Sequence, residues 1–191
     1  AETLKIVYTP LHGTGRVLVP EIMKECGLRY LYTVDSQMEP NGDFPGTPNP
    51  NPEFPEVFEE GIKLAEKVKS DLIIATDPDA DRVGIMARNK EGEFKTLTGN
   101  QVGSLLLDYI ITAYKEKGIE LKHPYAVKTI VSTELATKIC KENGVVLHNV
   151  LTGFKFIGEV IKNYEAKGYG DFLLGFEESY GYLAGGYVRD K

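Results

Sequence analysis

The chain contains, at residues 72–82, the sequence Leu-Ile-Ile-Ala-Thr-Asp-Pro-Asp-Ala-Asp-Arg. The apolar run at its start is typical of a strand buried in an α/β sheet. Pro78 prevents that strand from simply continuing, so the carboxylates of Asp77, Asp79 and Asp81 follow directly at its carboxyl end. Ligands of open α/β sheets bind at that end of the strands. The stretch therefore predicts an α/β fold and places a polar site in it.

Helix-like and strand-like patterns alternate on both sides of this stretch. Strands are expected at residues 4–8, 28–34, 72–75, 83–87, 94–97, 126–130, 145–150 and 172–176, and helices at 17–26, 53–69, 101–117, 134–143 and 156–167. Residues 37–52 are rich in proline and glycine and are expected to form an ordered surface loop. This alternation predicts two consecutive three-layer α/β/α domains with mixed sheets, at residues 1–97 and 98–191.

Composition narrows the class of protein. The 28 acidic and 22 basic residues give a formal net charge of -6, which opposes the basic surface that nucleic acid requires. The longest apolar runs fall far below the roughly 20 residues that span a bilayer, so no membrane association is expected. Cys26 and Cys140 lie far apart, which favours neither a disulfide framework nor a thiolate metal site and fits a reducing cytoplasm.

The three aspartates of the acidic loop are the strongest candidates for chemistry. Hard cations such as Mg²⁺ prefer carboxylate oxygens, so Asp77, Asp79 and Asp81 are predicted metal ligands. The alternative is a solvated acidic turn, but like charges this close repel one another unless a cation neutralises them. Arg82 follows at once, where its guanidinium either holds a phosphoryl oxygen or makes a surface salt bridge.

Three further motifs carry candidate residues. His12 lies in a glycine turn between a strand and a helix, where it is either a catalyst or a structural hydrogen-bonding group. Lys155 stands at a helix start, either to serve a ligand or to cover apolar surface. Glu177 and Ser179 lie two residues apart after a strand, a spacing that suits adjacent sugar hydroxyls but also an acidic edge turn.

Five short motifs, taken in order, resemble the α-D-phosphohexomutase superfamily, the phosphoglucomutases and phosphomannomutases. The resemblance is to the second and third domains of that family and covers almost the whole chain. The motifs are Thr9-Pro-Leu-His-Gly-Thr-Gly15, Pro48-Asn-Pro-Asn-Pro-Glu53, Asp77-Pro-Asp-Ala-Asp-Arg82, Thr152-Gly-Phe-Lys-Phe-Ile157 and Gly175-Phe-Glu-Glu-Ser179.

The resemblance implies an enzyme that interconverts hexose 1-phosphate and hexose 6-phosphate. A phosphoserine would donate its phosphoryl group, and a bisphosphate intermediate, glucose 1,6-bisphosphate for a glucose substrate, would reorient and return one. By position, the three aspartates would bind Mg²⁺ and Arg82 would lie near the phosphate. Glu177 and Ser179 would bind sugar hydroxyls, Lys155 would lie near the reacting groups, and His12 would be a further catalytic residue.

The chain also departs from the family pattern. It contains no serine-histidine-asparagine loop that could carry the phosphoserine, and no distal-phosphate loop. The resemblance therefore implies that domains I and IV are missing, and that the third domain stops at residue 191 before its closing helical part. We expect the chain to lack mutase activity by itself, because phosphoryl transfer depends on positioning all of these groups together.

Two other functions remain open from the sequence. Phosphatases with an aspartyl nucleophile also place Asp-x-Asp after an apolar strand, as Asp77 and Asp79 are placed here. Such an enzyme would also need a later pair of aspartates, which is absent. The second alternative is a non-catalytic module that binds sugar phosphate or Mg²⁺.

Overall fold

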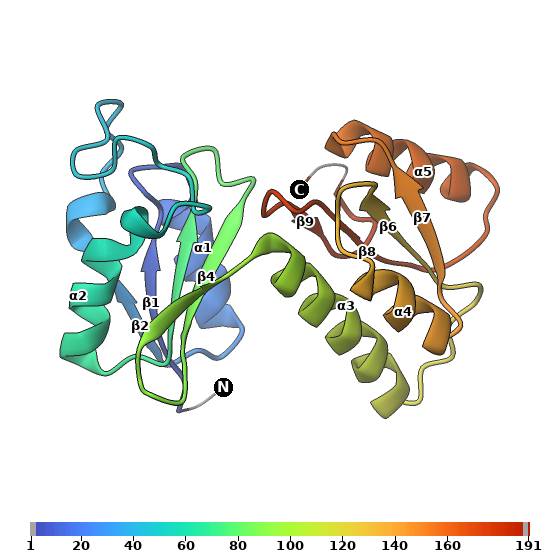
Figure 1. Ribbon diagram of the computed structural model, residues 1–191, viewed down its shortest axis with the longest axis horizontal. Coiled ribbons are helices and arrows are strands. Elements are labelled where there is room, and N and C mark those ends of the chain that lie inside the picture. The colour runs from blue at the N-terminus through green and yellow to red at the C-terminus, as the bar shows by residue number, and fades with distance from the viewer. Residues whose placement is uncertain (1–2, 189–190) are drawn as a thin grey trace. The chain divides into compact units, whose positions relative to one another are not determined.

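The computed structural model describes residues 3–188 and residue 191. The chain divides into two compact units, residues 1–97 and 98–191, each an α/β structure with its own sheet. Figure 1 shows both units coloured along the chain, with labels on those helices and strands for which there is room.

The first unit is built on a five-stranded sheet in the order β2-β1-β3-β4-β5. Strand β1 pairs in parallel with β2 and β3, whereas β4 and β5 are added antiparallel, so the sheet is mixed. Its elements are β1 (Lys5–Thr9), α1 (Gly15–Glu25), β2 (Tyr30–Thr33), the 3-10 turns η1 (Asp35–Gln37) and η2 (Pro55–Phe58), α2 (Glu59–Val68), β3 (Leu72–Thr76), β4 (Val83–Arg88) and β5 (Phe94–Leu97).

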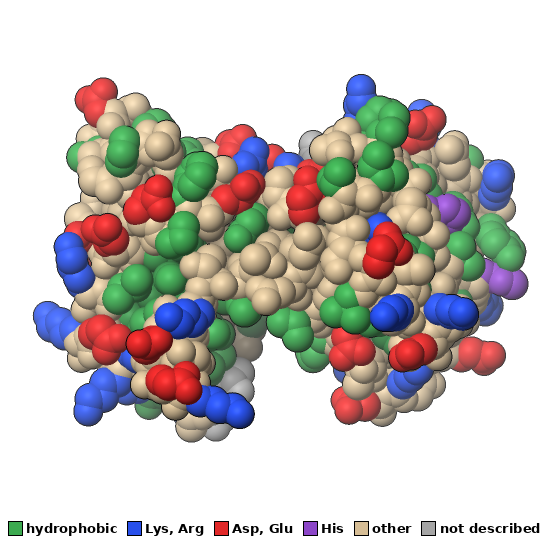
Figure 2. Space-filling view, in the orientation of Figure 1, with side chains coloured by type: hydrophobic (Ala, Val, Ile, Leu, Met, Phe, Trp, Pro, Cys, Tyr) green, Lys and Arg blue, Asp and Glu red, His purple; other side chains and the backbone are tan. Residues whose placement is uncertain are grey.

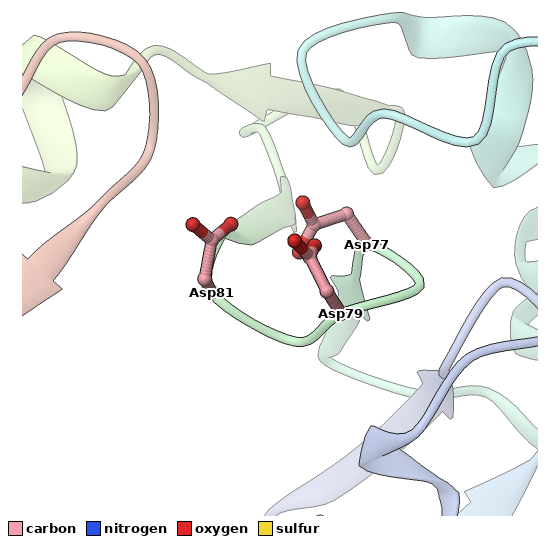
Figure 3. A group of neighbouring side chains, drawn as sticks. All are labelled: Asp77, Asp79 and Asp81. Carbon is pink, nitrogen blue, oxygen red and sulfur yellow. The ribbon is translucent and has the colours of Figure 1, made fainter. Parts of the chain in front are cut away.

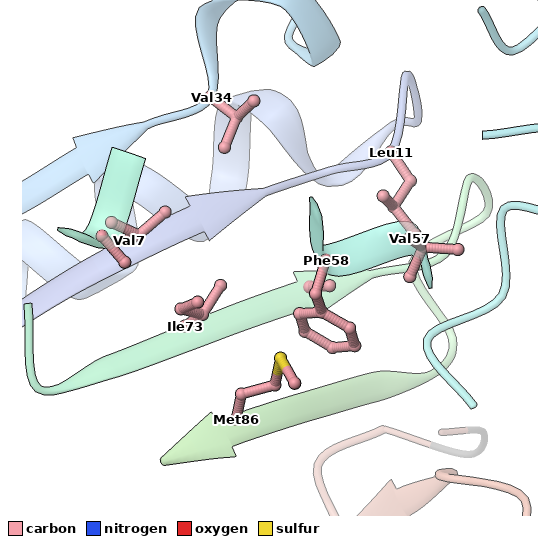
Figure 4. Packing of buried hydrophobic residues seen from close by; sticks show 9 residues of the cluster. Val7, Leu11, Val34, Val57, Phe58, Ile73 and Met86 are labelled. Carbon is pink, nitrogen blue, oxygen red and sulfur yellow. The ribbon is translucent and has the colours of Figure 1, made fainter. Parts of the chain in front are cut away.

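Helices cover both faces of this sheet. On one face, α2 approaches so closely that a Cβ added to Gly61 would lie 3.0 Å from a methyl group of Ile73. On the other face, a Cβ at Gly15, the first residue of α1, would lie 2.5 Å from the Tyr8 hydroxyl. The α2 side holds the main apolar core, in which Figure 4 shows Phe58 beside Met86. Helix, sheet and helix thus form three layers.

Two expected helices of this unit differ in detail from the structure. The segment expected as one helix over 53–69 begins with the 3-10 turn η2 and becomes α-helical only at Glu59. In the helix expected over 17–26, which forms as α1, the apolar residues Leu18 and Ile22 have the spacing of a shared helical face, yet they are 64% and 60% exposed. Helical spacing predicts that residues share a face, not that another element packs on it.

The second unit is built on a four-stranded sheet in the order β7-β6-β8-β9. Strand β6 pairs in parallel with β7 and β8, and the short edge strand β9 is antiparallel. Its elements are α3 (Gly99–Glu116), β6 (Tyr125–Thr129), α4 (Leu135–Glu142), β7 (Val146–Val150), α5 (Phe154–Ala166), β8 (Phe172–Phe176) and β9 (Tyr182–Leu183).

Adjacent residues of β8 show how this sheet is covered. A Cβ at Gly103 of α3 would lie 2.3 Å from the ring of Phe176, whereas a Cβ at Gly175 would lie 2.6 Å from Ile157 of α5. Helix α3 therefore packs on one face and α5 on the other, because successive residues of a strand point to opposite faces. The prediction of two α/β/α domains with mixed sheets is confirmed.

Helix α3 begins with a capping box. The Thr98 hydroxyl accepts a hydrogen bond from the Gln101 amide, and the Gln101 side chain accepts one from the Thr98 amide. These reciprocal bonds satisfy two donors at the helix start. They explain why the helix begins at Gly99 and not at residue 101.

The surface charges, the cysteines and the lengths of the helices complete the description of the fold. Acidic and basic side chains are interspersed on the face shown in Figure 2. Both Cys26, which is exposed, and Cys140, which is buried, are free thiols. Among the described helices, none combines the length and the apolar character needed to cross a membrane.

Candidate functional site

The three aspartates of the acidic loop converge at the carboxyl end of β3. One carboxylate oxygen from each of Asp77, Asp79 and Asp81 lies within 4.8 Å of the others. Figure 3 shows Asp77 and Asp79 side by side and Asp81 projecting from the far end of the same loop. Between them, Ala80 adopts a left-handed conformation with φ of 61°. Such strain in a non-glycine residue is tolerated where surrounding contacts hold the loop in place.

The electrostatics of this cluster favour a cation. Burial, together with a hydrogen bond to Asp79 and the negative charges of Asp79 and Asp81, raises the pKa of Asp77 to about 7, although a hydrogen bond from the Arg82 amide acts to lower it. Asp77 is only 7% exposed, so water screens this repulsion poorly. Three carboxylate oxygens at this spacing fit a hard divalent cation such as Mg²⁺, which would relieve the repulsion.

Arg82 lies within the same cluster, and Glu53, which lies outside the cluster, bonds to its guanidinium. Its amide donates to Asp77 Oδ1 at 2.9 Å, and its Nε lies 3.7 Å from Asp77 Oδ2 and 3.8 Å from Asp81 Oδ1. Its Nη1 donates to Glu53 Oε1 at 3.2 Å. Sequence reasoning did not single out Glu53, although it ends the proline-rich loop. The guanidinium thus stays beside the carboxylates without forming a close pair with them.

The loop after β1 packs directly on the acidic loop. The Thr14 amide donates to the carbonyl of Pro78 at 2.8 Å, and a Cβ at Gly13 would lie 2.3 Å from the Pro78 Cα. Only glycine permits this approach. His12 contacts a different loop, with Nδ1 2.9 Å from the Glu39 carbonyl and Nε2 3.3 Å from the Pro45 carbonyl. His12 therefore connects the loop after β1 to the loop formed by residues 39–45.

The second unit brings two other predicted motifs together. Glu177 is only 3% exposed, and its Oε1 accepts from the Gly153 amide at 3.0 Å, at the start of α5. Its Oε2 accepts from Lys191 Nζ at 3.2 Å. Lys155, in the first turn of α5, is exposed, with Nζ 4.8 Å from the centre of the Phe156 ring. The loop after β8 and the start of α5 therefore form one polar cluster at the carboxyl edge of this sheet.

Ser179 lies in the same loop as Glu177 and is partly exposed. The glutamate between these motif residues was not predicted to have a role. Glu178 Oε2 accepts a hydrogen bond from the hydroxyl of Thr129, the last residue of β6, and lies 3.4 Å from the hydroxyl of Ser132 in the turn that follows. The sequence signal for this neighbourhood is Lys128, a charged residue within an apolar strand that the structure buries completely.

The fold and the two loops define an α/β protein of the open-sheet class, with polar side chains at the carboxyl ends of its central parallel strands. Family models then identify the group. Residues 1–92 match "Phosphoglucomutase/phosphomannomutase, alpha/beta/alpha domain II", and residues 98–191 match domain III of the same family. The chain belongs to the phosphoglucomutase/phosphomannomutase family.

A curated relative agrees with this assignment. The chain is 40% identical over 188 residues to a phosphoglucomutase of Staphylococcus aureus, covering 98% of this chain. That match spans 33% of the relative, so the chain corresponds to about a third of the relative's length.

Solved structures share the fold at lower identity. A phosphoglucomutase/phosphomannomutase family protein from Burkholderia thailandensis gives a TM-score of 0.75 at 18% identity, over 98% of this chain and 37% of that one. An N-acetylphosphoglucosamine mutase from Aspergillus fumigatus gives 0.65 at 17% identity, over 94% and 36%.

Proposed function

We propose that this chain is the central part of a phosphohexomutase that interconverts hexose 1-phosphates and hexose 6-phosphates through a phosphoserine and a bisphosphate. The observation that carries the proposal is the cluster of Asp77, Asp79 and Asp81 beside Arg82 at the carboxyl end of β3. Membership of a family whose curated relatives include phosphoglucomutases supports it.

In this proposal the first unit holds Mg²⁺ as the second domain of the enzyme. Asp77, Asp79 and Asp81 would bind the cation, which neutralises charge on the transferring phosphoryl group when bound. Arg82, kept in place by Glu53, would hold a phosphoryl oxygen. His12 would act from a distance by holding the 39–45 loop, because both of its ring nitrogens face backbone carbonyls.

The second unit would recognise the sugar as the third domain. Glu177 and Ser179 would bind adjacent hydroxyls, and a hydroxyl would replace Lys191 on Glu177 Oε2. Lys155, exposed at the start of α5, would contact a phosphate or a reacting group. Support for these ligands comes from the A. fumigatus mutase structures, one with GlcNAc-6P and magnesium and another with glucose 1,6-bisphosphate.

The serine that carries the phosphoryl group, and the other half of the phosphate clamp, would belong to domains I and IV of a longer protein. The matched share of the relative, 33%, is consistent with this. The two free thiols fit a reducing compartment, and we propose the cytoplasm.

The experiment that tests this function uses ³²P-labelled glucose 1,6-bisphosphate and Mg²⁺. We expect the chain to bind the bisphosphate without becoming labelled, because it supplies binding groups but no phosphoserine. Label on the protein that hydroxylamine releases and that Asp77→Asn abolishes would overturn the proposal. That result would instead favour a phosphatase with an aspartyl nucleophile.

A further inference from the structure

Two consecutive glutamates in the loop after β8 bond to different parts of the second unit. Glu177 accepts from the Gly153 amide, at the start of the helix on one face of the sheet. Glu178 Oε2 accepts from Thr129 Oγ1 at 2.9 Å, at the end of β6. The loop is therefore tethered through two adjacent side chains, one bonded at the start of α5 and the other at the end of β6.

The two hydroxyl groups next to the Glu178 carboxylate, those of Thr129 and Ser132, are buried and bonded to each other. Thr129 is 0% and Ser132 is 4% exposed, and their hydroxyl oxygens lie 2.8 Å apart. Ser132 Oγ also lies 3.4 Å from Glu178 Oε2. Each hydroxyl has one proton to donate, and an ionised carboxylate only accepts. Glu178 therefore supplies the acceptor that this buried pair needs.

The turn that carries Ser132 is itself fixed. Lys128 is 0% exposed, and its Nζ donates to the Ser132 carbonyl at 3.0 Å and to Glu134 Oε1 at 3.1 Å. The Thr133 amide donates to Asn100 Oδ1 of α3 at 2.9 Å. A rigid turn gives Glu178 a defined attachment point.

The loop backbone is also held closely. A Cβ at Gly99 would lie 2.0 Å from the Glu178 carbonyl oxygen, so the loop presses against the start of α3. The Glu177 amide donates to the Gly181 carbonyl at 3.0 Å, which closes the loop, and Tyr180 is left-handed with φ of 68°. The backbone of residues 177–181 is thus closely constrained next to the attachment through Glu178.

We propose that Glu178, bonded to Thr129 and Ser132, is a positioning residue that fixes the 177–181 loop in the conformation that presents Glu177 and Ser179. The identity of the ligand, a hexose phosphate, rests on the proposed function, but the positioning does not. Preorganisation of this kind raises affinity because the ligand does not have to order the loop.

Amide hydrogen exchange of the ligand-free chain tests the positioning directly. In Glu178→Ala, the amides of residues 177–181 should exchange about tenfold faster, as expected for the loss of one hydrogen bond to a charged group. The amides of β6 and β8 should keep their wild-type rates. Glu178→Gln retains an acceptor oxygen and should recover most of the protection, and the exposed Glu159→Ala is a charge-matched control.

Thr129→Val tests the same bond from the other side and keeps the shape of the side chain. It should speed up hydrogen exchange of the same amides. The double variant should exchange no faster than Glu178→Ala, because the two substitutions remove the same interaction. If Glu178→Ala does not fold, Thr129→Val decides alone. Unchanged loop exchange, or equal acceleration throughout the second unit, would overturn the proposal.

Titration with glucose 1-phosphate and Mg²⁺ separates this inference from the proposed function. Weaker binding in Glu178→Ala, recovered in Glu178→Gln, would extend the positioning role to the sugar. If the wild-type chain does not bind the sugar phosphate, the proposed ligand is contradicted, whereas the exchange rates still decide the role of Glu178.

Discussion

The amide nitrogen of Gly153 lies 3.0 Å from a carboxylate oxygen of Glu177. This bond joins two motifs that lie 24 residues apart. Gly153 precedes α5 with φ of 122°, a conformation that favours glycine, and it directs its amide at the carboxylate. A negative charge is stabilised at a helix start, so the bond contributes to the stability of the unit as well as to the site.

Glu177→Ala should lower the free energy of unfolding of the second unit by about 1.5–3 kcal/mol, the usual contribution of a hydrogen bond to a charged group. Denaturant titration of the chain measures this loss. The matched control is Glu159→Ala, which removes an exposed carboxylate from α5 and should change stability by less than about 0.5 kcal/mol. Equal losses in the two variants would show that the Gly153 bond contributes nothing.

Mg²⁺ should stabilise the first unit against heat. At a concentration ten times its dissociation constant, a bound ion contributes about 1.4 kcal/mol, which corresponds to several degrees in a domain of this size. Asp79→Asn should remove most of this shift. It should also make the metal-free unit more stable than wild type, because it removes a charge that repels Asp77.

Asp43→Asn is the control for the metal prediction, since Asp43 is exposed and lies in another loop. It should leave the Mg²⁺-dependent shift in melting temperature intact. A shift of the same size in Asp79→Asn and wild type would rule out a metal site in the acidic loop.

His148 should make the second unit less stable in mild acid. Burial lowers the pKa of His148 below its ordinary value of 6.5. The unfolded chain therefore takes up a proton first, so stability is full above pH 6.5 and falls as the pH drops towards the folded-state pKa. Unfolding measured between pH 8 and pH 5 should show this fall, with a slope of at most about 1.4 kcal/mol per pH unit.

Replacing His148 by glutamine should flatten that profile. His123→Gln serves as the comparison, because it replaces an exposed histidine of the same unit. A profile that His148→Gln does not alter would assign the acid sensitivity to other groups.

Gly103→Ala should destabilise the second unit although alanine favours helices. The added Cβ would lie 2.3 Å from the ring of Phe176, and overpacking of this kind costs about 1–3 kcal/mol. Gly42→Ala is the matched control, because a Cβ at Gly42 meets nothing within 4 Å. Thermal unfolding should therefore separate the two variants, and a neutral Gly103→Ala would mean that α3 does not pack on Phe176 as closely as the structure shows.

The sequence predicts most of this fold because helix and strand periods are local properties. The apolar run at residues 72–75 becomes β3 at Leu72–Thr76, and the acidic loop that follows brings its three carboxylates together as expected. The short strand β9 was not predicted, since its two residues are too few to show an alternating pattern. The 3-10 turn η2 was also missed, because Pro55 is compatible with either kind of helix start.

The contacts between motifs could not be predicted in the same way. Glu53 meets Arg82 across 29 residues, and Glu178 meets Thr129 across 49. These pairings depend on which strands lie side by side and on which way each side chain points. Nothing in the local pattern around Glu178 distinguishes an exposed glutamate from one that accepts a hydrogen bond from a buried pair of hydroxyl groups.

An enzyme assay of a chimera tests the proposed mutase function most directly. In it, residues 1–191 replace the aligned third of the S. aureus phosphoglucomutase, to which the chain is 40% identical. We expect the chimera to convert glucose 1-phosphate to glucose 6-phosphate with Mg²⁺, and we expect Asp79→Asn to lower the rate by about 100-fold or more. A chimera that folds and accepts ³²P from glucose 1,6-bisphosphate, but does not interconvert the two sugar phosphates, would contradict it.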